Sequence, residues 1–147
     1  MKVIDIPPVW LLICLVFAWW LSGIAPELGF GAWARWAGPI LVIGGIALMA
    51  AAIWQMNRAK TTLIPHQDPS ALVTGGIFQY SRNPIYLGDA LVLTGLILRW
   101  DAVLAVPLIP AFVWVIHARF IRHEERRLEE GFPSEFEAYR AATRRWI

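Results

Sequence analysis

The segment from Tyr80 to Gly88, with the sequence YSRNPIYLG, combines residue types that suit binding of an anion at a helix start. Asn83 is a preferred residue for the position before a helix, and Pro84 suits the first helical position. A helix start offers free backbone N–H groups and the positive end of the helix dipole, and Arg82 adds a full charge. A carboxylate would sit well here. A capped helix with Arg82 reaching toward lipid headgroups is the alternative explanation.

Three polar residues of this segment recur at helical spacing. Asn83, Tyr86 and Asp89 are separated by three residues each, so they share one face of a helix. Asp89 falls inside an apolar stretch, where a carboxylate is costly unless it faces protein or a wet cavity. Asp89 is therefore either a functional residue or a structural partner of an arginine or another polar group.

A second polar cluster lies later in the chain, at His117, Arg119, His123, Glu124 and Glu125. Two of these residues, His117 and Glu124, are seven positions apart, which places them on one face of a regular helix. Carboxylates here would bind a ligand amine or the hydroxyls of a ribose. A solvated helix held by pairs such as Glu124 with Arg127 is the alternative.

Other kinds of chemistry find no support in the sequence. The single cysteine, Cys14, excludes a disulfide framework and a cysteine-rich metal site. Motifs for zinc hydrolysis, dinucleotide binding, phosphate-loop binding and a nucleophile elbow are absent, so we expect no metal. The net charge of +2 is too small to indicate a nucleic-acid partner.

The elements that position these residues are four apolar blocks, at about 9–25, 37–56, 84–98 and 102–121. With 58% hydrophobic and 16% charged residues in 147, the chain has too few charges to cover this apolar surface in water. Glycines in the second block permit close helix packing. The first block could instead be a signal peptide, but Pro26 follows its best cleavage position and further blocks follow it.

The segments between and after the blocks are shorter or polar. Residues 57–83 form a loop rich in proline and glycine, and Arg99-Trp100-Asp101 is a tight turn. Pro107 and Pro110 are expected to bend the fourth block. Ser134 and Glu137 fit a capping box that opens a last, amphipathic helix, which either lies on the bilayer or covers a site. The sequence thus predicts an all-α polytopic membrane protein with about four transmembrane helices and a C-terminal cytoplasmic amphipathic helix.

The basic residues orient these helices. With a cytoplasmic N-terminus, only two basic residues, Arg35 and Arg99, lie in the outer turns. Eleven lie in the inner segments, namely Lys2, Arg58, Lys60, Arg82, Arg119, Arg122, Arg126, Arg127, Arg140, Arg144 and Arg145. This bias predicts that both termini, the polar loop and the charged tail lie on the cytoplasmic face of the inner membrane.

Taken together, these segments resemble the superfamily of isoprenylcysteine carboxyl methyltransferases and phospholipid methyltransferases. The resemblance covers about 61–147 and is carried by the segments 71–80 and 81–88, by Glu124-Glu125 with Leu128, Phe132 and Tyr139, and by the C-terminal RRWI. The order and spacing of these segments match those of the superfamily. Asn83 stands where several members carry histidine, which argues against proton transfer at this position. The larger eukaryotic members have additional N-terminal spans.

The resemblance implies a single methyltransferase domain over residues 1–147, with two N-terminal spans in 1–56 and a cofactor-binding catalytic core in 57–147. It implies that S-adenosylmethionine is bound by Val73, Gly75, Gly76, Tyr80, Arg82, Asn83, Tyr86, Leu87, Glu124 and Glu125. The expected catalytic residues are Tyr86, Asp89, His117 and Glu124, with a base needed only for an amine acceptor.

The acceptor is expected to be a lipophilic small molecule or lipid, such as an isoprenoid carboxylate or a lipid amine. We expect it to approach sideways between the second and fourth blocks, near Trp54 and Trp114. Two alternatives are an NADPH-dependent membrane reductase of the sterol-reductase type, since such enzymes share a related helical core, and a non-enzymatic membrane scaffold.

Overall fold

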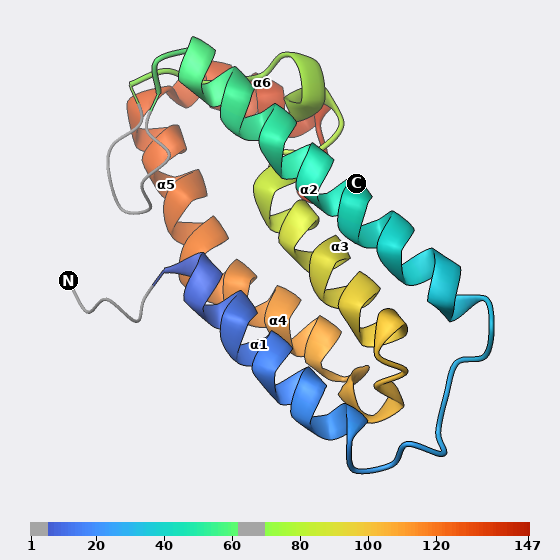
Figure 1. The fold of residues 1–147 in the computed structure, drawn as a ribbon. Coiled ribbons are helices and arrows are strands. Elements are labelled where there is room, and N and C mark those ends of the chain that lie inside the picture. The colour runs from blue at the N-terminus through green and yellow to red at the C-terminus, as the bar shows by residue number, and fades with distance from the viewer. Residues whose placement is uncertain (1–5, 62–69) are drawn as a thin grey trace.

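The structure is a computed structural model that describes residues 6–61 and 70–147; Lys2 and most of the first half of the polar loop lie outside these ranges. The described residues are helical or irregular and contain no strand, as predicted. They form the α-helices α1 (Pro7–Ser22), α2 (Ala34–Arg58), α3 (Pro84–Arg99), α4 (Leu108–Ile116), α5 (Arg122–Gly131) and α6 (Pro133–Ala142) (Figure 1). Short 3-10 turns span Gly76–Gln79 and Val103–Ala105, and a π-helical segment, His117–Ile121, joins α4 to α5.

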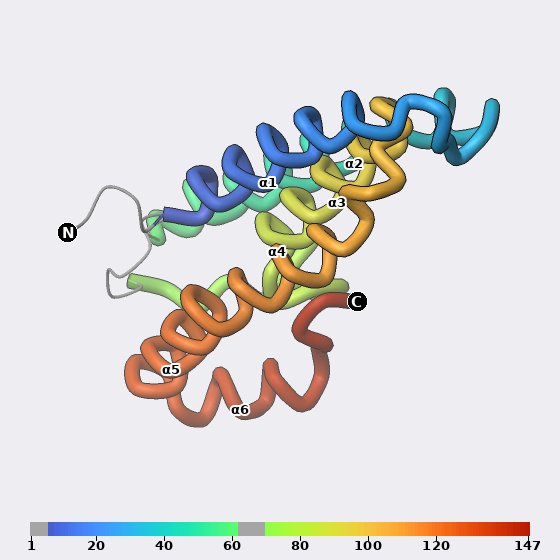
Figure 2. The backbone as a smooth tube through the Cα atoms, turned by 90° about the horizontal axis from the view of Figure 1, so that it is seen from below, coloured from blue at the N-terminus to red at the C-terminus, as the bar shows by residue number. Residues whose placement is uncertain are grey.

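The helices α1 to α4 alternate in direction, so that their ends meet at two opposite ends of the molecule (Figures 1 and 2). The start of α1, the end of α2, the start of α3 and all of α5 lie at the end where α6 is found, here called the α6 end. Short connections, including the turn at Asp101, lie at the opposite end. All the polar segments singled out from the sequence therefore meet at the α6 end.

Two helices are long and apolar enough to cross a membrane. These are Ala34–Arg58, with 25 residues, and the continuous helix Val103–Gly131, with 29. On α2 the rings of Trp36 and Trp54 are 76% and 58% exposed, and about 27 Å of helix separates them, close to the thickness of a hydrocarbon core. Exposed tryptophans at this spacing are typical of the two interfaces of a bilayer. These features indicate an integral membrane protein.

Glycines set the distance between α2 and α3, which run side by side. Gly38 faces Gly95, and Gly45 faces Gly88, one pair two helical turns beyond the other. A Cβ atom on Gly38 would lie 2.7 Å from the carbonyl oxygen of Gly95, and one on Gly45 would lie 2.6 Å from that of Gly88. The two backbones therefore touch, and this contact places the C-terminal half of α2 beside the start of α3.

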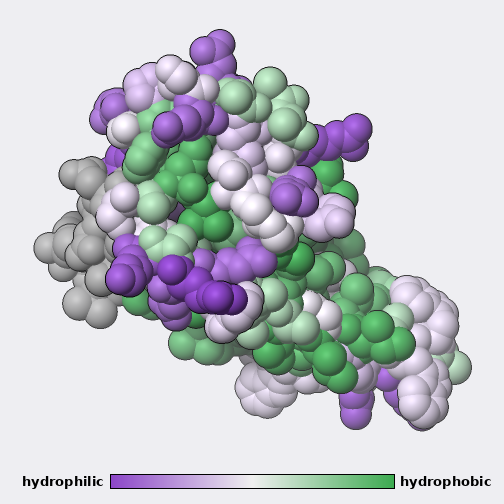
Figure 3. All heavy atoms as spheres, turned by 90° about the horizontal axis from the view of Figure 1, so that it is seen from above, coloured by the Kyte–Doolittle hydropathy of each residue, from purple (hydrophilic) through white to green (hydrophobic). Residues whose placement is uncertain are grey.

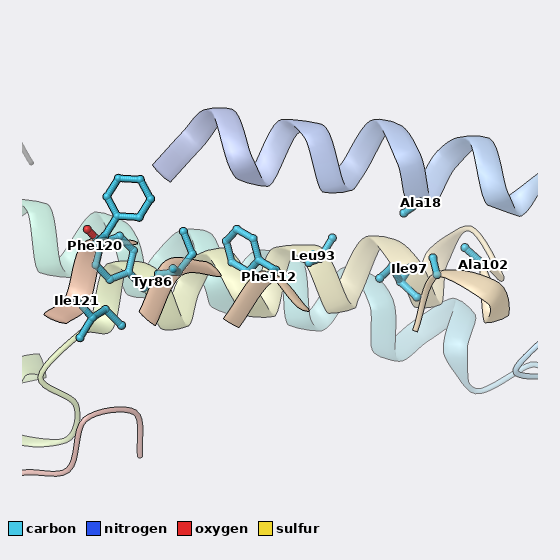
Figure 4. Close-up of a cluster of buried hydrophobic side chains, with 10 residues drawn as sticks. Ala18, Tyr86, Leu93, Ile97, Ala102, Phe112, Phe120 and Ile121 are labelled. Carbon is cyan, nitrogen blue, oxygen red and sulfur yellow. The ribbon is translucent and has the colours of Figure 1, made fainter. Parts of the chain in front are cut away.

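The core lies between α1, α3 and α4 (Figure 4). Leu93 and Ile97 of α3 pack against Phe112 and Ile116 of α4, and all four are fully buried. The π-helical segment continues this core with Phe120 and Ile121, beside Tyr86 at the α6 end (Figure 4). The packed core thus extends to the residues that the sequence singles out for chemistry.

The last helix packs on protein. Phe136 and Tyr139 of α6 are buried with Phe78 and Ala52 in a second apolar cluster. The predicted capping box is wrong, because α6 begins at Pro133 and no side chain caps it. Proline suits the first helical position, so the helix starts one residue before Ser134.

Candidate active site

A cavity of about 520 Å³ opens at the α6 end between α2, α3, α5 and α6. Figure 3 views the molecule from this end, where hydrophilic side chains surround a hollow with hydrophobic residues inside it. One wall is apolar and comes from α2, with Met49, Ile53 and Met56. The start of α1 extends this wall. The polar residues of the lining, here called the ionic wall, are Thr61, Arg82, Asn83, Tyr86, Asp89, Glu124, Glu125 and Arg127.

Most of the residues expected to act together do meet in this cavity. Its lining includes seven of them, namely Val73, Arg82, Asn83, Tyr86, Asp89, Glu124 and Glu125. They come from three separate parts of the chain, and the antiparallel packing of α3 against the helix that ends in α5 brings them together. Residues from both polar clusters of the sequence thus line one cavity.

Other expected residues lie outside the cavity lining. The ring of Tyr80 is 74% exposed, and Leu87 is half-buried on another face of α3. Gly75 and Gly76 also lie outside the cavity lining. The φ of Gly76 is +57°, a backbone conformation that suits glycine, and its Cα lies against the side chain of Gln55. The amide oxygen of Gln55 accepts a hydrogen bond from the backbone N–H of Ile77 at 3.2 Å. Packing against α2 therefore explains the glycine at position 76.

His117 is also outside the lining, although Glu124, seven residues later, is inside it. The expectation that the two share a face assumed a regular α-helix. The segment His117–Ile121 is a π-helix, which takes more residues per turn than an α-helix. The regular spacing of seven residues between His117 and Glu124 is therefore interrupted by this segment. Of the two prolines expected to bend the fourth block, Pro107 directly precedes α4 and Pro110 lies in its first turn.

Tyr86 and Glu124 form a short hydrogen bond across the cavity wall. The phenol of Tyr86 donates to Oε1 of Glu124 at 2.6 Å. Asp89 lies one turn further along the same face of α3 and is 6% exposed. The polar wall therefore carries two carboxyl groups and a phenol close together, at the edge of the apolar core.

A network of ionic contacts surrounds Glu125. Arg145 donates from Nε and Nη2 to the two oxygens of Glu125, at 3.0 and 2.8 Å. Arg82 approaches the same carboxylate at 3.4 Å. Burial lowers the pKa of the Arg82 guanidinium, while the adjacent Glu125 carboxylate opposes this shift, and hydrogen bonds to Glu125 raise the pKa of Arg145. Both arginines stay charged at neutral pH.

The C-terminal segment is bonded to the start of α3. The backbone carbonyl of Arg145 accepts hydrogen bonds from the Asn83 side-chain amide at 3.0 Å and from the Ser81 hydroxyl at 3.4 Å. The carbonyl of Arg144 accepts from the N–H of Arg82 at 3.0 Å. Asn83 therefore occupies the predicted position before α3, but its side chain does not cap the helix.

Sequence reasoning missed the roles of Arg127 and Arg145 in the site. Arg127 was read as a surface partner of Glu124, yet it lines the cavity. Phe136 lines the cavity and lies 6.0 Å from the guanidinium of Arg82, and Arg145 holds Glu125. The position of Arg127 one helical turn after Glu124 was the available signal; the contacts of Arg145 had none in the local sequence.

The two tryptophans named for acceptor approach do not line the cavity. The ring of Trp54 lies 4.8 Å from the guanidinium of Arg58, and Trp114 is 69% exposed. On the side of α2 the cavity is bounded by Met49, Ile53 and Met56.

The fold and the cavity define the class of this protein: a helical membrane protein with a partly ionic, partly apolar cavity at one end. The sequence profile of the phospholipid methyltransferase family matches residues 33–135, which is more than half of the chain. The chain belongs to this family. The match confirms the resemblance read from the sequence and extends it through α2. No curated protein and no solved structure matches the chain.

Proposed function

We propose that this protein is a methyltransferase that uses S-adenosylmethionine to methylate a lipophilic acceptor at the membrane interface. The observation that carries the proposal is the mixed lining of the cavity, which combines ionic groups of α3 and α5 with apolar residues of α2. A charged donor and a lipophilic acceptor need such a pair of walls. Membership of a methyltransferase family supports the same reaction.

The residues present fit the donor. Two nitrogens of Arg82, Nε and Nη1, are buried without a hydrogen-bond partner among the described residues, and Arg82 suits the carboxylate of the donor. Glu124 and Glu125 are the acceptors available for its ammonium group or ribose hydroxyls. Asn83 and Tyr86 complete this wall, and Val73 lies beside it.

The donor supplies an electrophilic methyl group on a sulfonium. The carbon–sulfur bond breaks, a bond to the acceptor oxygen, nitrogen or sulfur forms, and a neutral thioether leaves. The protein positions the two reactants and excludes water. A protonated amine acceptor must also lose a proton, and Glu124, Asp89 and Tyr86 are the groups placed to accept or relay it. His117 does not line the cavity and is therefore the weaker candidate.

We propose that four helices span the membrane, with the α6 end at the cytoplasmic face of the inner membrane. The exposed apolar side chains of α1 and α2 and the concentration of basic residues at the α6 end support this arrangement. Reporter fusions after Lys60, at Arg99 and at the C-terminus should read inside, outside and inside. An outside reading after Lys60 contradicts the topology.

The donor is tested by calorimetric titration of purified protein with S-adenosylmethionine, its demethylated product and NADPH. We expect the first two to bind and NADPH not to bind. Glu125→Ala should weaken donor binding by about 1–3 kcal/mol, the scale of a charge-assisted hydrogen bond. The matched control is Glu130→Ala, an exposed residue of the same helix. Binding of NADPH alone identifies a reductase, and binding of none identifies a scaffold.

The acceptor is tested with lipids of one headgroup and graded chain length, at equal surface concentration in micelles. A chain that lies against α2 gains little over a chain in lipid, so turnover should vary weakly with length. A steep optimum in length contradicts open approach from the bilayer. Equal turnover of water-soluble headgroup analogues contradicts delivery from the membrane.

A further inference from the structure

The segment 71–79, which precedes α3, forms part of the cavity although it contains no α-helix. Four of its residues belong to the cavity lining, namely Ala71, Leu72, Val73 and Phe78. The regular structure within it is the short 3-10 turn Gly76–Gln79. Such a segment satisfies few of its backbone hydrogen bonds internally, so its position depends on the contacts that the surrounding helices make with it.

One of these helices is α6. The phenol of Tyr139 donates a hydrogen bond to the carbonyl of Phe78 at 2.6 Å, and the hydroxyl of Thr143 donates to the carbonyl of Gln79 at 3.4 Å. The ring of Phe78 is also buried with Phe136 in the second apolar cluster. These contacts hold the end of the segment that leads to α3.

The other helix is α2, which holds the segment through Gln55. Oε1 of Gln55 accepts a hydrogen bond from the backbone N–H of Ile77 at 3.2 Å. The same side chain lies against the Cα of Gly76, where a Cβ atom would overlap its amide group. A second contact lies just beyond α2, where Oγ1 of Thr61 accepts from the N–H of Ala71 at 3.4 Å. The segment is therefore fastened on both sides.

Gln55 itself does not line the cavity, although Met56, the next residue of α2, does. Gln55 is half-buried and lies one helical turn after Ala52, which is buried with Phe78 in the second apolar cluster. An amide in apolar surroundings is costly unless it is hydrogen-bonded. The bond to Ile77 offsets this cost, and it joins the helix of the apolar wall to the turn that carries Phe78.

We propose that Gln55 is a positioning residue, which fastens the turn Gly76–Gln79 to α2 and so sets the place of Val73 and Phe78 beside the ionic wall. It acts through the segment 71–79 and contacts neither reactant. The inference rests on the proposed function for the identity of the ligand, S-adenosylmethionine. Loss of the Gln55 contact should let the segment move and weaken binding of this donor.

Gln55→Leu removes the acceptor of the Ile77 N–H and keeps most of the side-chain volume. The dissociation constant of S-adenosylmethionine, measured by calorimetry in a neutral detergent, should rise roughly five- to twenty-fold. Asn57→Leu is the matched control, because it replaces an amide on the same helix at an exposed position outside the cavity lining. The control should bind the donor like the parent. Equal affinities in Gln55→Leu and the parent overturn the proposal.

Gln55→Glu separates positioning from an effect on stability. The carboxylate keeps an oxygen for the Ile77 N–H, so the affinity for S-adenosylmethionine should return to within about three-fold of the parent. The same change places a negative charge in the last turn of α2, where the helix dipole disfavours it, so the unfolding midpoint should stay below that of the parent. If affinity instead follows the unfolding midpoint across the parent and both variants, the role is structural and the assignment is overturned.

Gly76→Ala tests the same contact from the other partner. The new Cβ would overlap the amide of Gln55 at a φ of +57°, so it should displace that side chain and break its bond to Ile77. The variant should bind S-adenosylmethionine at least as weakly as Gln55→Leu. Because both changes break one contact, the double variant should bind no more than about two-fold weaker than Gly76→Ala alone. Losses that multiply would show that the two residues act separately, and would overturn the proposal.

Hydrogen exchange of residues 74–79 separates this proposal from methyl transfer. Without any ligand, the N–H of Ile77 should exchange faster in Gln55→Leu than in the parent or in Asn57→Leu. If the parent binds no S-adenosylmethionine but exchange rises in this way, the methyl-transfer proposal fails and the fastening of the segment by Gln55 stands. If exchange in Gln55→Leu equals that of the parent, the role of Gln55 is overturned, whatever the protein binds.

Discussion

The contact of α2 with α3 and the contact of the C-terminal segment with the start of α3 are built on different physics. Glycine backbones touch in the first, with Gly38 against Gly95 and Gly45 against Gly88. The second consists of hydrogen bonds and ion pairs, such as those from Arg145 to Glu125. The first positions α2 by shape alone, whereas the second depends on charged and polar groups that we propose also bind the ligand.

The two contacts therefore have different roles at the start of α3. The glycine contact holds the apolar wall of the cavity, since Met49, Ile53 and Met56 follow Gly45 on α2. The polar contact of the C-terminal segment arranges Arg82 and Glu125 on the ionic wall. We therefore expect changes in the first to act on folding, and changes in the second to act on ligand binding and activity.

Deleting Pro133–Ile147 is the strongest test of the polar contact and should have the largest effect. Phe136 and Tyr139 would no longer close the cavity, and Glu125 would lose its closer partner, Arg145. The truncated protein should insert in the membrane but retain little activity in a methylation assay. Full activity after truncation would show that the segment only anchors the protein to the membrane.

The glycine contact is broken by Gly45→Ala. The new Cβ would lie 2.6 Å from the carbonyl oxygen of Gly88, so the helices must separate. We expect a loss of about 1–3 kcal/mol in the free energy of unfolding, measured in detergent. Gly44→Ala is the matched control, because no atom lies within 4 Å of its Cβ, and it should be neutral or stabilising. Equal losses at both positions would refute the contact.

Tyr139→Phe removes one hydrogen bond beneath the C-terminal segment. The phenol donates to the carbonyl of Phe78 at 2.6 Å, and burial raises the pKa of Tyr139 to about 12, so the donor proton is retained at neutral pH. Losing this bond should cost about 1–2 kcal/mol, because the carbonyl stays buried. Thermal unfolding and protease protection of α6 measure the effect. Tyr80→Phe, at a ring that is 74% exposed, should leave both unchanged.

Arg140→Ala should have the smallest effect. Arg140 contacts Glu129 at 3.7 Å, and the two side chains are 48% and 56% exposed. An ion pair in such a position contributes about 0.5 kcal/mol or less and is screened by salt. Unfolding midpoints of the variant and parent should therefore agree in moderate salt. A larger loss in the free energy of unfolding would contradict the minor contribution expected of this ion pair.

Much of the fold follows from local sequence. The first three apolar blocks become α1, α2 and α3 with ends within three residues of the prediction, because a long apolar run needs its backbone hydrogen bonds closed within a helix. The fourth block, 102–121, divides into a short 3-10 turn, α4 and the π-helical segment. Pro84 and Asn83 correctly marked the start of α3. The family, too, was recognisable from the residues around Arg82 and Glu124, and the profile match confirms it.

Other features needed the folded chain. The π-helical segment at His117–Ile121 changes the register between His117 and Glu124, and the regular spacing used for the prediction did not reveal it. Pro133, not Ser134, opens α6. The role of Gly76 depends on Gln55, which lies 21 positions earlier in the chain.

The sequence by itself determined the helical class, the family and the residue types that meet at one helix start, because composition, periodicity and capping act over a few neighbouring residues. Only the tertiary structure decided which partners these groups contact. It pairs the carboxylate of Glu125 with Arg82 and Arg145, turns Asn83 toward the C-terminal segment, and leaves buried nitrogens of Arg82 and Arg127 without a hydrogen-bond partner among the described residues. The reason is that a hydrogen bond requires two groups at about 3 Å, and that distance between remote segments is set by packing.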